Sequence, residues 1–261
     1  MEKKKIILIV ILVVFLGIAI GFFLTSNKKT NNNVNDNNSN SNSNSKDNTS
    51  NNSELISSYE SGTTVVSFYK NGNIVVSDNS GNGTGKMENY GEVSLNPWNA
   101  FTLGVSMKKL IIEKGVLNLG DNAFNSFNLE KIEWSDDLER IGDANFPRMY
   151  NLELPTLPAN LKEIGKTVFA QDFKDDVNNT LVIPKNCTVI GNGTFYNTGI
   201  HHFIIEAETL TVGKENESGT FWIGCKHDIT IEVKNESVKQ AILNNLVDDD
   251  NGRIKVIVKS N

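Results

Sequence analysis

The sequence lacks the short motifs that identify common catalytic sites. Its 261 residues contain no G-x-S-x-G, no phosphate-binding P-loop and no HExxH pattern. Carboxylates are numerous enough that a glycosidase-like pair can be chosen almost anywhere, so no single pair carries an argument. These absences predict a protein that is not an enzyme and that uses no cofactor and no metal.

Cysteine and histidine are scarce, with two and three copies. Cys187 and Cys225 can form one disulfide in an exported protein, but we favour the alternative of reduced, buried thiols. His201, His202 and His227 are the nearest approach to a metal-binding set. Because adjacent residues of a strand point to opposite faces, His201 and His202 do not easily bind one ion, and scattered surface histidines are the preferred interpretation.

Basic residues are also outnumbered by acidic residues in the part of the chain that can fold. Residues 1–53 hold six of the 25 basic and three of the 31 acidic residues, which leaves 19 and 28, a net charge near −9, for residues 54–261. Such an acidic region is a poor partner for nucleic acid or an anionic membrane surface. Charge alone does not identify the partner.

One long apolar run is present at the N-terminus. Three lysines at residues 3–5 precede nineteen uncharged residues, Ile6 to Leu24, long enough for a helix of about 28 Å. A cleaved signal peptide is the alternative, but its apolar part is usually shorter and ends in a small-residue site. We therefore predict one transmembrane helix within residues 1–26, with the lysines in the cytoplasm and the remaining chain at the cell surface, outside the plasma membrane.

The next segment has almost nothing apolar to bury. Residues 27–53 include 13 asparagines and 6 serines. They do not offset the entropy of folding, which predicts a disordered linker over residues 27–57. An aggregation-prone Asn-rich tract is the alternative, but the serine and charged interruptions favour a spacer.

A pattern of an aliphatic residue, glycine, three mixed residues and phenylalanine recurs through the middle of the chain. Its copies are LGDNAF (119–124), IGDANF (141–146), IGKTVF (164–169) and IGNGTF (190–195), and a degenerate fifth copy starts at Val212. Glycines spaced by 22, 23 and 26 residues predict a solenoid in which the phenylalanines stack and each glycine makes a close turn. Between these copies, short runs with period-two alternation predict one parallel strand per repeat. These runs are residues 110–112, 132–134, 152–154, 181–183, 203–205 and 229–231.

The two patterns together resemble the BspA-type leucine-rich repeat. The closest copies are LEKIEWSDDLERIGDANF (129–146) and LVIPKNCTVIGNGTF (181–195), and the resemblance covers about residues 107–232. It implies a β-rich repeat solenoid from a family of bacterial surface proteins associated with adhesion. The segments 172–180 and 214–219 depart from the consensus.

Both ends of the repeats have distinct sequences. In residues 58–106, two β-rich runs flank Asn71-Gly72, a strong hairpin signal, and a stretch ending in Pro97-Trp98 predicts a cap that covers the open end. Residues 233–261 predict a C-terminal cap, with a helix over 237–246 whose N-cap is Ser237 and a strand over 254–258. A cap protects a terminal strand from pairing with other chains.

Functional residues are expected on the outward face of the strands, where the sequence varies between repeats. By alternation that face carries Lys109, Ile111, Glu113, Lys131, Glu133, Ser135, Glu153, Val182, His202, Ile204, Glu206, Thr230 and Glu232. Stacked repeats present extended surfaces suited to binding a partner, and a simply solvated face is the alternative.

Three functions remain open. The first is non-catalytic binding or adhesion to a protein or glycan by a membrane-anchored surface protein. The second is a glycan-active enzyme of the cell envelope, which needs a cleft with carboxyl groups of perturbed pKa. The third is a structural surface spacer with no specific ligand. Repeat architecture alone does not choose among them.

Overall fold

The computed structural model describes residues 54–99, 106–213, 227–246 and 252–259, which lie within one compact unit, Asn51–Asn261. The apolar run at 6–24, Cys225 and the phenylalanine of the fifth repeat copy lie outside these residues. Among the helices of the described residues, none has the length and apolar character needed to cross a membrane.

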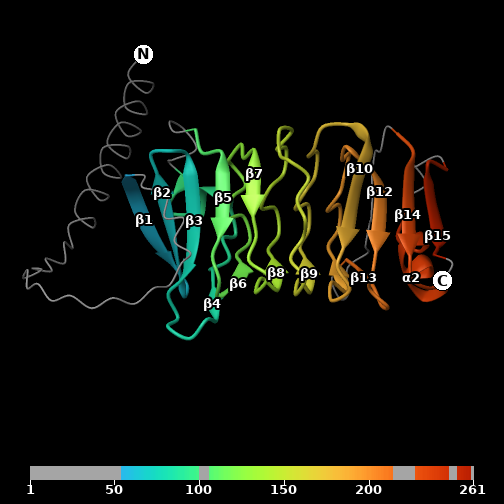
Figure 1. The fold of residues 1–261 in the computed structure, drawn as a ribbon, viewed down its shortest axis with the longest axis horizontal. Helices are drawn as coiled ribbons and strands as arrows, with labels where there is room; N and C mark the ends of the chain where they lie inside the picture. The colour runs from blue at the N-terminus through green and yellow to red at the C-terminus, as the bar shows by residue number, and fades with distance from the viewer. Residues whose placement is uncertain (1–53, 100–105, 214–226, 247–251, 260–261) are drawn as a thin grey trace, which may run out of the picture. The chain divides into compact units, whose positions relative to one another are not determined.

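Two sheets of long strands and one sheet of short strands build a solenoid (Figure 1). The first sheet has the order β1 (Leu55–Ser61), β2 (Thr64–Tyr69), β3 (Asn73–Asp78), β5 (Lys109–Ile112), β7 (Lys131–Glu133). The second has the order β10 (Asp176–Ile183), β12 (Ile200–Ile205), β14 (Ile229–Val233), β15 (Ile254–Val258). We call the outward side of these two sheets the strand face.

The third sheet, which we call the corner sheet, was not predicted. Its order is β13 (Thr211–Val212), β11 (Val189–Ile190), β9 (Glu163–Ile164), β8 (Arg140–Ile141), β6 (Val116–Leu119), β4 (Gly85–Lys86). The aliphatic residue before each repeat glycine lies in one of its strands, and neighbouring coils pair in parallel, for example Ile141 with Ile164. A coil such as that of β5 and β6 therefore contributes to two sheets.

A continuous stack of aromatic rings forms the centre of the solenoid. Phe124, Phe146, Phe169 and Phe195 are fully buried, and successive ring centroids are 6.2, 5.8 and 6.1 Å apart with interplanar angles of 7°, 21° and 10°. Trp98 extends the stack at 6.2 Å from Phe124. The predicted phenylalanine ladder is confirmed, because one large apolar side chain per coil fills the space that no single repeat closes alone.

The repeat glycines serve close approach between coils and not a left-handed turn. A Cβ on Gly165 would lie 2.6 Å from the backbone N of Asp143 and 2.7 Å from the carbonyl carbon of Gly142. The positive φ angle of the corner occurs two residues later, at 50° for Thr167 and 51° for Ala144. The predicted close turn is thus real, but glycine is needed because the preceding coil leaves no room for a side chain.

Five of the six predicted repeat strands form, and one does not. Residues 152–154 are not a strand, although Glu153 N donates to the Glu130 carbonyl at 2.9 Å. Pro155 and Pro158 follow at once, and proline cannot donate to a ladder. The long-strand sheet is consequently interrupted between β7 and β10.

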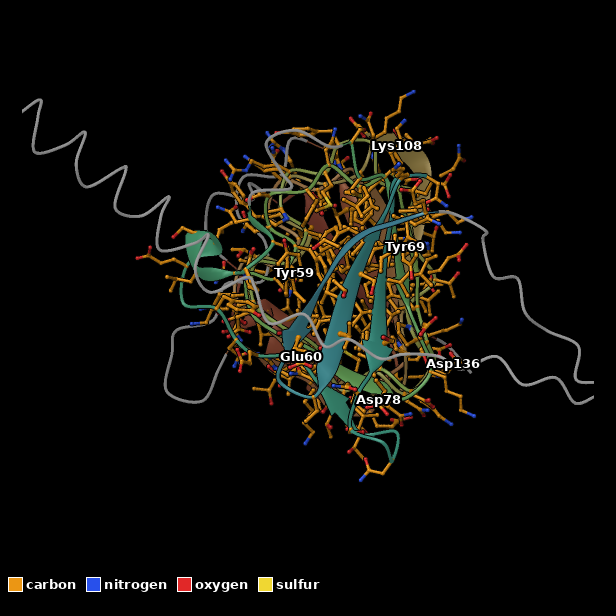
Figure 2. All side chains as sticks on the ribbon, turned by 90° about the vertical axis from the view of Figure 1, so that its left-hand side faces the viewer. Tyr59, Glu60, Tyr69, Asp78, Lys108 and Asp136 are labelled. Atoms are coloured by element: carbon orange, nitrogen blue, oxygen red, sulfur yellow. The ribbon has the colours of Figure 1, made fainter. Side chains whose placement is uncertain are left out.

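The N-terminal cap is a coil built like the repeats that follow it. The predicted hairpin pairs β2 with β3, and β3 then pairs in parallel with β5. Trp98, fully buried, takes the place of the repeat phenylalanine and donates from Nε1 to the Ala123 carbonyl at 2.7 Å, whereas Pro97 is exposed. Seen from this end, β1 to β3 lie across the solenoid, with Tyr69 and Lys108 near one edge and Glu60 and Asp78 near the other (Figure 2).

Two predicted boundaries are corrected. β1 starts at Leu55, inside the segment 27–57 assigned to the linker, because residues 55–61 pair with β2. At the other end, α2 (Glu236–Leu243) is capped by Asn235, whose side chain accepts from Val238 N, and not by Ser237. The strand predicted at 254–258 is β15, which pairs in parallel with β14.

Candidate binding face

All thirteen predicted residues are exposed or half-buried, and all except Glu153 lie on the strand face or just beyond it. On or just beyond the first sheet lie Lys109, Ile111, Glu113, Lys131, Glu133 and Ser135, and on or just beyond the second lie Val182, His202, Ile204, Glu206, Thr230 and Glu232. Glu153 lies in the interruption between them. The intervening residues, such as Leu110 and Ile132, are buried. Alternation therefore placed the side chains correctly, and their role in binding stays a prediction.

Of the three aliphatic residues predicted on this face, one is exposed and two are half-buried. Val182 is 42% exposed and belongs to the exposed large hydrophobic residues, whereas Ile111 and Ile204 are only half-buried. The strand face is thus mainly polar, and a partner that relies on a broad apolar patch does not suit it.

Charges on the first sheet are paired across neighbouring strands. Lys109 Nζ lies 2.7 Å from Glu133 Oε1, and Lys131 Nζ lies 4.0 Å from carboxylates of both Glu133 and Glu153. These side chains are largely solvated, so each pair contributes about 0–1 kcal/mol to stability. Their main effect is to hold a row of alternating charge at the border of the interruption.

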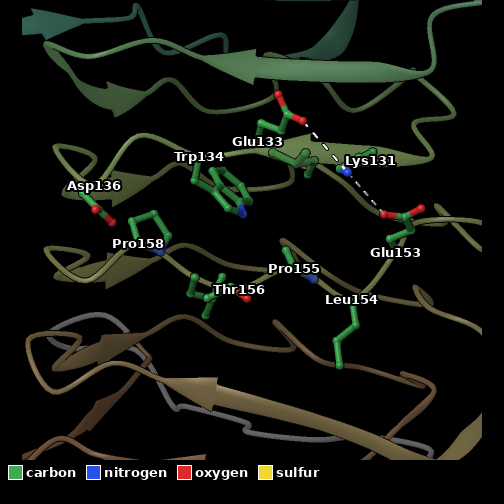
Figure 3. A pocket seen from close by; sticks show the side chains of 11 residues that line it. Lys131, Glu133, Trp134, Asp136, Glu153, Leu154, Pro155, Thr156 and Pro158 are labelled. Atoms are coloured by element: carbon green, nitrogen blue, oxygen red, sulfur yellow. Dashed lines mark ion pairs between the residues drawn. The ribbon is translucent and has the colours of Figure 1, made fainter. Parts of the chain in front are cut away.

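A pocket of about 420 Å³ lies where the sheet is interrupted. Lys131, Glu133 and Trp134 line it from β7 and its end, and Glu153 and Pro155 line it from the irregular segment (Figure 3). In the close-up, the Trp134 indole faces the cavity, and the ion pairs of Lys131 cross its rim. Residues of two coils thus form one concave site because the second coil leaves the ladder.

Trp134 carries an unsatisfied hydrogen-bond donor in this pocket. Its Nε1 is buried and has no hydrogen-bond partner among the described residues, and its ring meets Phe146 edge-on at 5.8 Å and 77°. A buried N–H without an acceptor is costly and unusual, and tryptophan combines a large apolar surface with such a donor at binding sites. The ring is held in place by the aromatic core, and its donor is unpaired among the described residues.

Neither this pocket nor the role of Trp134 was predicted from the sequence. Trp134 ends the run 132–134 that was predicted as a strand, and alternation gave no sign that the neighbouring coil departs from the ladder. A signal was present, because Pro155 and Pro158 are two of the chain's five prolines and lie within four residues of each other. A pair of prolines after a repeat strand indicates an interrupted sheet.

The histidines are not scattered. The rings of His201 and His227 stack with centroids 3.8 Å apart, and His201 Nε2 lies 2.5 Å from Asp175 Oδ1. His202 points to the strand face instead, with Nε2 at 3.3 Å from Glu232 Oε1. The predicted opposite orientation of His201 and His202 is confirmed, and the interpretation of isolated surface histidines is wrong for His201 and His227.

Two titratable groups are buried away from the pocket. Burial raises the pKa of Asp172 to about 8, against the lowering effect of hydrogen bonds from the backbone N–H groups of Met149 and Arg148. Burial also raises the pKa of the Cys187 thiol to about 12. Neither residue lines the pocket next to Trp134, so both belong to the core of the solenoid.

Comparison with known proteins agrees with the repeat geometry. A family model described as BspA type leucine rich repeat region matches residues 97–217 with six copies, one more than the five recognised in the sequence. The match starts at residue 97, so it includes Trp98 of the N-terminal cap, in keeping with the place of this ring in the aromatic stack.

One solved structure is similar, and no curated protein matches. It is a leucine-rich repeat protein from Eubacterium ventriosum, with 22% sequence identity and a TM-score of 0.49. The alignment covers 68% of this chain and 43% of that one, so this chain spans less than half the length of its structural relative. On the family match and the coil geometry, residues 97–217 of this chain are BspA-type leucine-rich repeats.

Proposed function

We propose that this chain binds a protein or glycan partner, without catalysis, through the strand face and the pocket next to Trp134. The observation that carries the proposal is the cavity of about 420 Å³ lined by Trp134, a residue whose buried Nε1 lacks an acceptor among the described residues. A cavity of this size takes one or two side chains or a short sugar segment, and the surrounding charges give it specificity.

The charges of the pocket favour a ligand with cationic or neutral hydrogen-bonding groups. The described residues that line it include three carboxylates and one cation, namely Asp136, Glu133, Glu153 and Lys131. In addition, residues 54–261 carry a net charge near −9. An anionic glycan is repelled by such a field, whereas a basic protein surface is attracted and a neutral sugar is tolerated. A partner carbonyl or hydroxyl oxygen is a suitable acceptor for the Trp134 N–H.

The N-terminal segments support a location at the cell surface. The apolar run Ile6–Leu24 has the length of a membrane-spanning helix, and the Asn/Ser-rich segment behind it has the composition of a flexible tether. In this proposal a single-pass anchor holds the repeats outside the plasma membrane, where they adhere to a partner. Fractionation tests the anchor: retention of the full chain in membranes supports it, and release of a shortened chain into the medium opposes it.

The alternatives of an enzyme and a spacer have less support. A glycan-active enzyme needs a cleft with carboxyl groups of shifted pKa, and Asp172, the carboxyl whose pKa is raised to about 8, is buried outside this pocket. A spacer does not need a buried donor without a partner. The binding proposal is therefore the one that uses both the pocket and the donor of Trp134, which is unpaired in the described part of the chain.

Binding to arrays of basic matrix proteins and neutral glycans tests the proposal directly. The full chain in detergent is compared with Trp134→Phe, which keeps a ring but removes the N–H, and with Glu153→Gln at the pocket rim. Tyr150→Ala is the matched control, because Tyr150 is 59% exposed and does not line the pocket.

The proposal predicts a saturable signal that both pocket variants weaken about tenfold, while the Tyr150 variant keeps it. Loss of a hydrogen bond to a buried donor is worth about 1–3 kcal/mol, which corresponds to such a change. No saturable partner, or a partner bound equally by all four proteins, contradicts the proposal.

A further inference from the structure

The structure brings together one carboxylate and two imidazoles from three successive coils. Asp175, His201 and His227 are separated by 26 residues each, and one ligand atom of each lies within 4.8 Å of the other two. We propose that these three residues bind a transition-metal ion of the Zn²⁺ or Cu²⁺ class at the edge of the second sheet.

The repeat scaffold explains why these side chains meet. Asp175 directly precedes β10, His201 is the second residue of β12, and His227 lies two residues before β14. These strands are neighbours in parallel pairing, and parallel strands are about 4.8 Å apart. In the register of these strands His201 is level with Ile229 and not with His227, so the three side chains reach one another from nearby positions of neighbouring strands, without any long loop.

His227 already has the backbone contact that is typical of a metal ligand. Its Nε2 lies 2.8 Å from the Thr198 carbonyl oxygen. A carbonyl oxygen only accepts, so Nε2 carries the proton and, in the neutral ring, Nδ1 is left with a lone pair. Donation of one ring N–H to a backbone carbonyl fixes the tautomer of metal-binding histidines.

Two contacts between a ring nitrogen and an oxygen atom describe the present state of this cluster. With Nε2 protonated, His227 Nδ1 faces the Asp228 carbonyl oxygen at 3.2 Å, and His201 Nε2 faces Asp175 Oδ1 at 2.5 Å. The His201 contact is a hydrogen bond when Nε2 carries the proton, and at His227 the Nδ1 lone pair is available to an ion. Ligand atoms around a tetrahedral zinc ion are about 3.3 Å apart. Because the two imidazole rings are stacked and nearly parallel, one ring must turn and the exposed Asp175 side chain must shift for an ion to replace the proton.

The donor set indicates which ions suit the cluster. Two imidazoles and one carboxylate favour borderline ions such as Zn²⁺ and Cu²⁺ over Ca²⁺ or Mg²⁺, which prefer oxygen ligands. Three side-chain ligands leave a fourth position for water or for a ligand atom of a partner. An ion here would tie β10, β12 and β14 together, independently of the pocket at Trp134.

Titration of the full chain in detergent with Zn²⁺, and separately with Cu²⁺, tests the proposal by calorimetry and by the shift in melting temperature. His201→Gln and Asp175→Asn remove ligands, and Asp175 is exposed, so its variant folds even if a histidine variant does not. His202→Gln is the matched control, since it changes the adjacent histidine that points to Glu232.

The wild-type chain is expected to bind one ion that raises its melting temperature. His201→Gln and Asp175→Asn should weaken that binding at least tenfold and abolish the thermal shift, while His202→Gln leaves both unchanged. Absence of binding by the wild type means that the cluster holds only protons and overturns the proposal. The proposal is also overturned if His201→Gln binds the ion as tightly as the wild type, or if His202→Gln loses binding as much as His201→Gln does.

Discussion

Gly165 lies so close to Asp143 of the preceding coil that a Cβ on Gly165 would be 2.5 Å from Asp143 Oδ1. This carboxylate oxygen accepts from the backbone N of Lys166 at 2.9 Å. The glycine and the carboxylate therefore act together. Because Gly165 has no side chain, the two coils can approach, and the Asp143 oxygen then accepts from the N–H group of Lys166. The same proximity recurs between Gly142 and Asp121.

Gly165→Ala should destabilise the fold strongly. The added methyl group would meet the backbone of two residues of the neighbouring coil at under 3 Å, so the coils must separate. We expect a loss of about 3 kcal/mol in the free energy of unfolding, comparable with severe overpacking. Urea denaturation measures it. Gly91→Ala is the matched control, because a Cβ there meets nothing within 4 Å, and a similar loss in that variant would argue against close coil contact as the cause.

Asn145→Ala should also destabilise the solenoid, through lost hydrogen bonds. Asn145 is fully buried, and its Nδ2 donates at 2.8 Å to the carbonyl oxygens of both Gly120 and Gly142. Removing it leaves two buried acceptors unpaired, at a cost of about 2–3 kcal/mol. Thermal and urea unfolding measure this change.

Replacing Asn145 by threonine should cost less stability than replacing it by alanine. In the last of the four full repeat copies, Thr194 donates to the carbonyl oxygens of Gly165 and Gly191 at 2.6 and 2.8 Å. Asn145→Thr is therefore expected to be more stable than Asn145→Ala. Equal stability of the two variants would mean that these hydrogen bonds do not contribute.

Asp172 should make the protein less stable as the pH rises from about 4 to about 8. Its pKa is about 8 in the folded state, against 3.8 for the exposed group. In that window the folded protein keeps a proton that the unfolded chain has released, so the free energy of unfolding falls with pH, by about 1 kcal/mol per unit. Below this window the contribution is complete, and above it the contribution is lost.

Asp172→Asn should remove this dependence and stabilise the protein at pH 8. The neutral amide keeps an oxygen to accept from Met149 N, a contact of 2.6 Å in the present structure, without the cost of a buried charge. Urea denaturation at pH 5 and pH 8 separates the two proteins. An unchanged difference between the two pH values in the variant would assign the dependence to other groups.

Sequence periodicity predicted the parts of the fold that each coil repeats. The spacing of glycine and phenylalanine gave the aromatic stack of Phe124, Phe146, Phe169 and Phe195, and alternation gave the outward side chains of the long strands. These succeed because each is fixed by burial of an apolar face, which leaves its mark in residue type.

Features that depend on contacts between coils were not predicted. The strands of the corner sheet are mostly two residues long, such as Glu163–Ile164, and two residues show no alternation. The pocket next to Trp134 arises because the following coil is irregular, and the pairing of His201 with His227 depends on the register of β12 with β14. Predicting any of these three features requires knowledge of the register between neighbouring coils.

Hydrogen exchange of the full chain, with and without the partner that the arrays identify, tests the binding proposal most directly. We predict that the partner slows exchange of the backbone amides at residues 131–136 and in the irregular segment 153–157, which line the pocket. Protection confined to the corner sheet, with the amides around Trp134 unchanged, would contradict the assignment of the strand face as the binding surface.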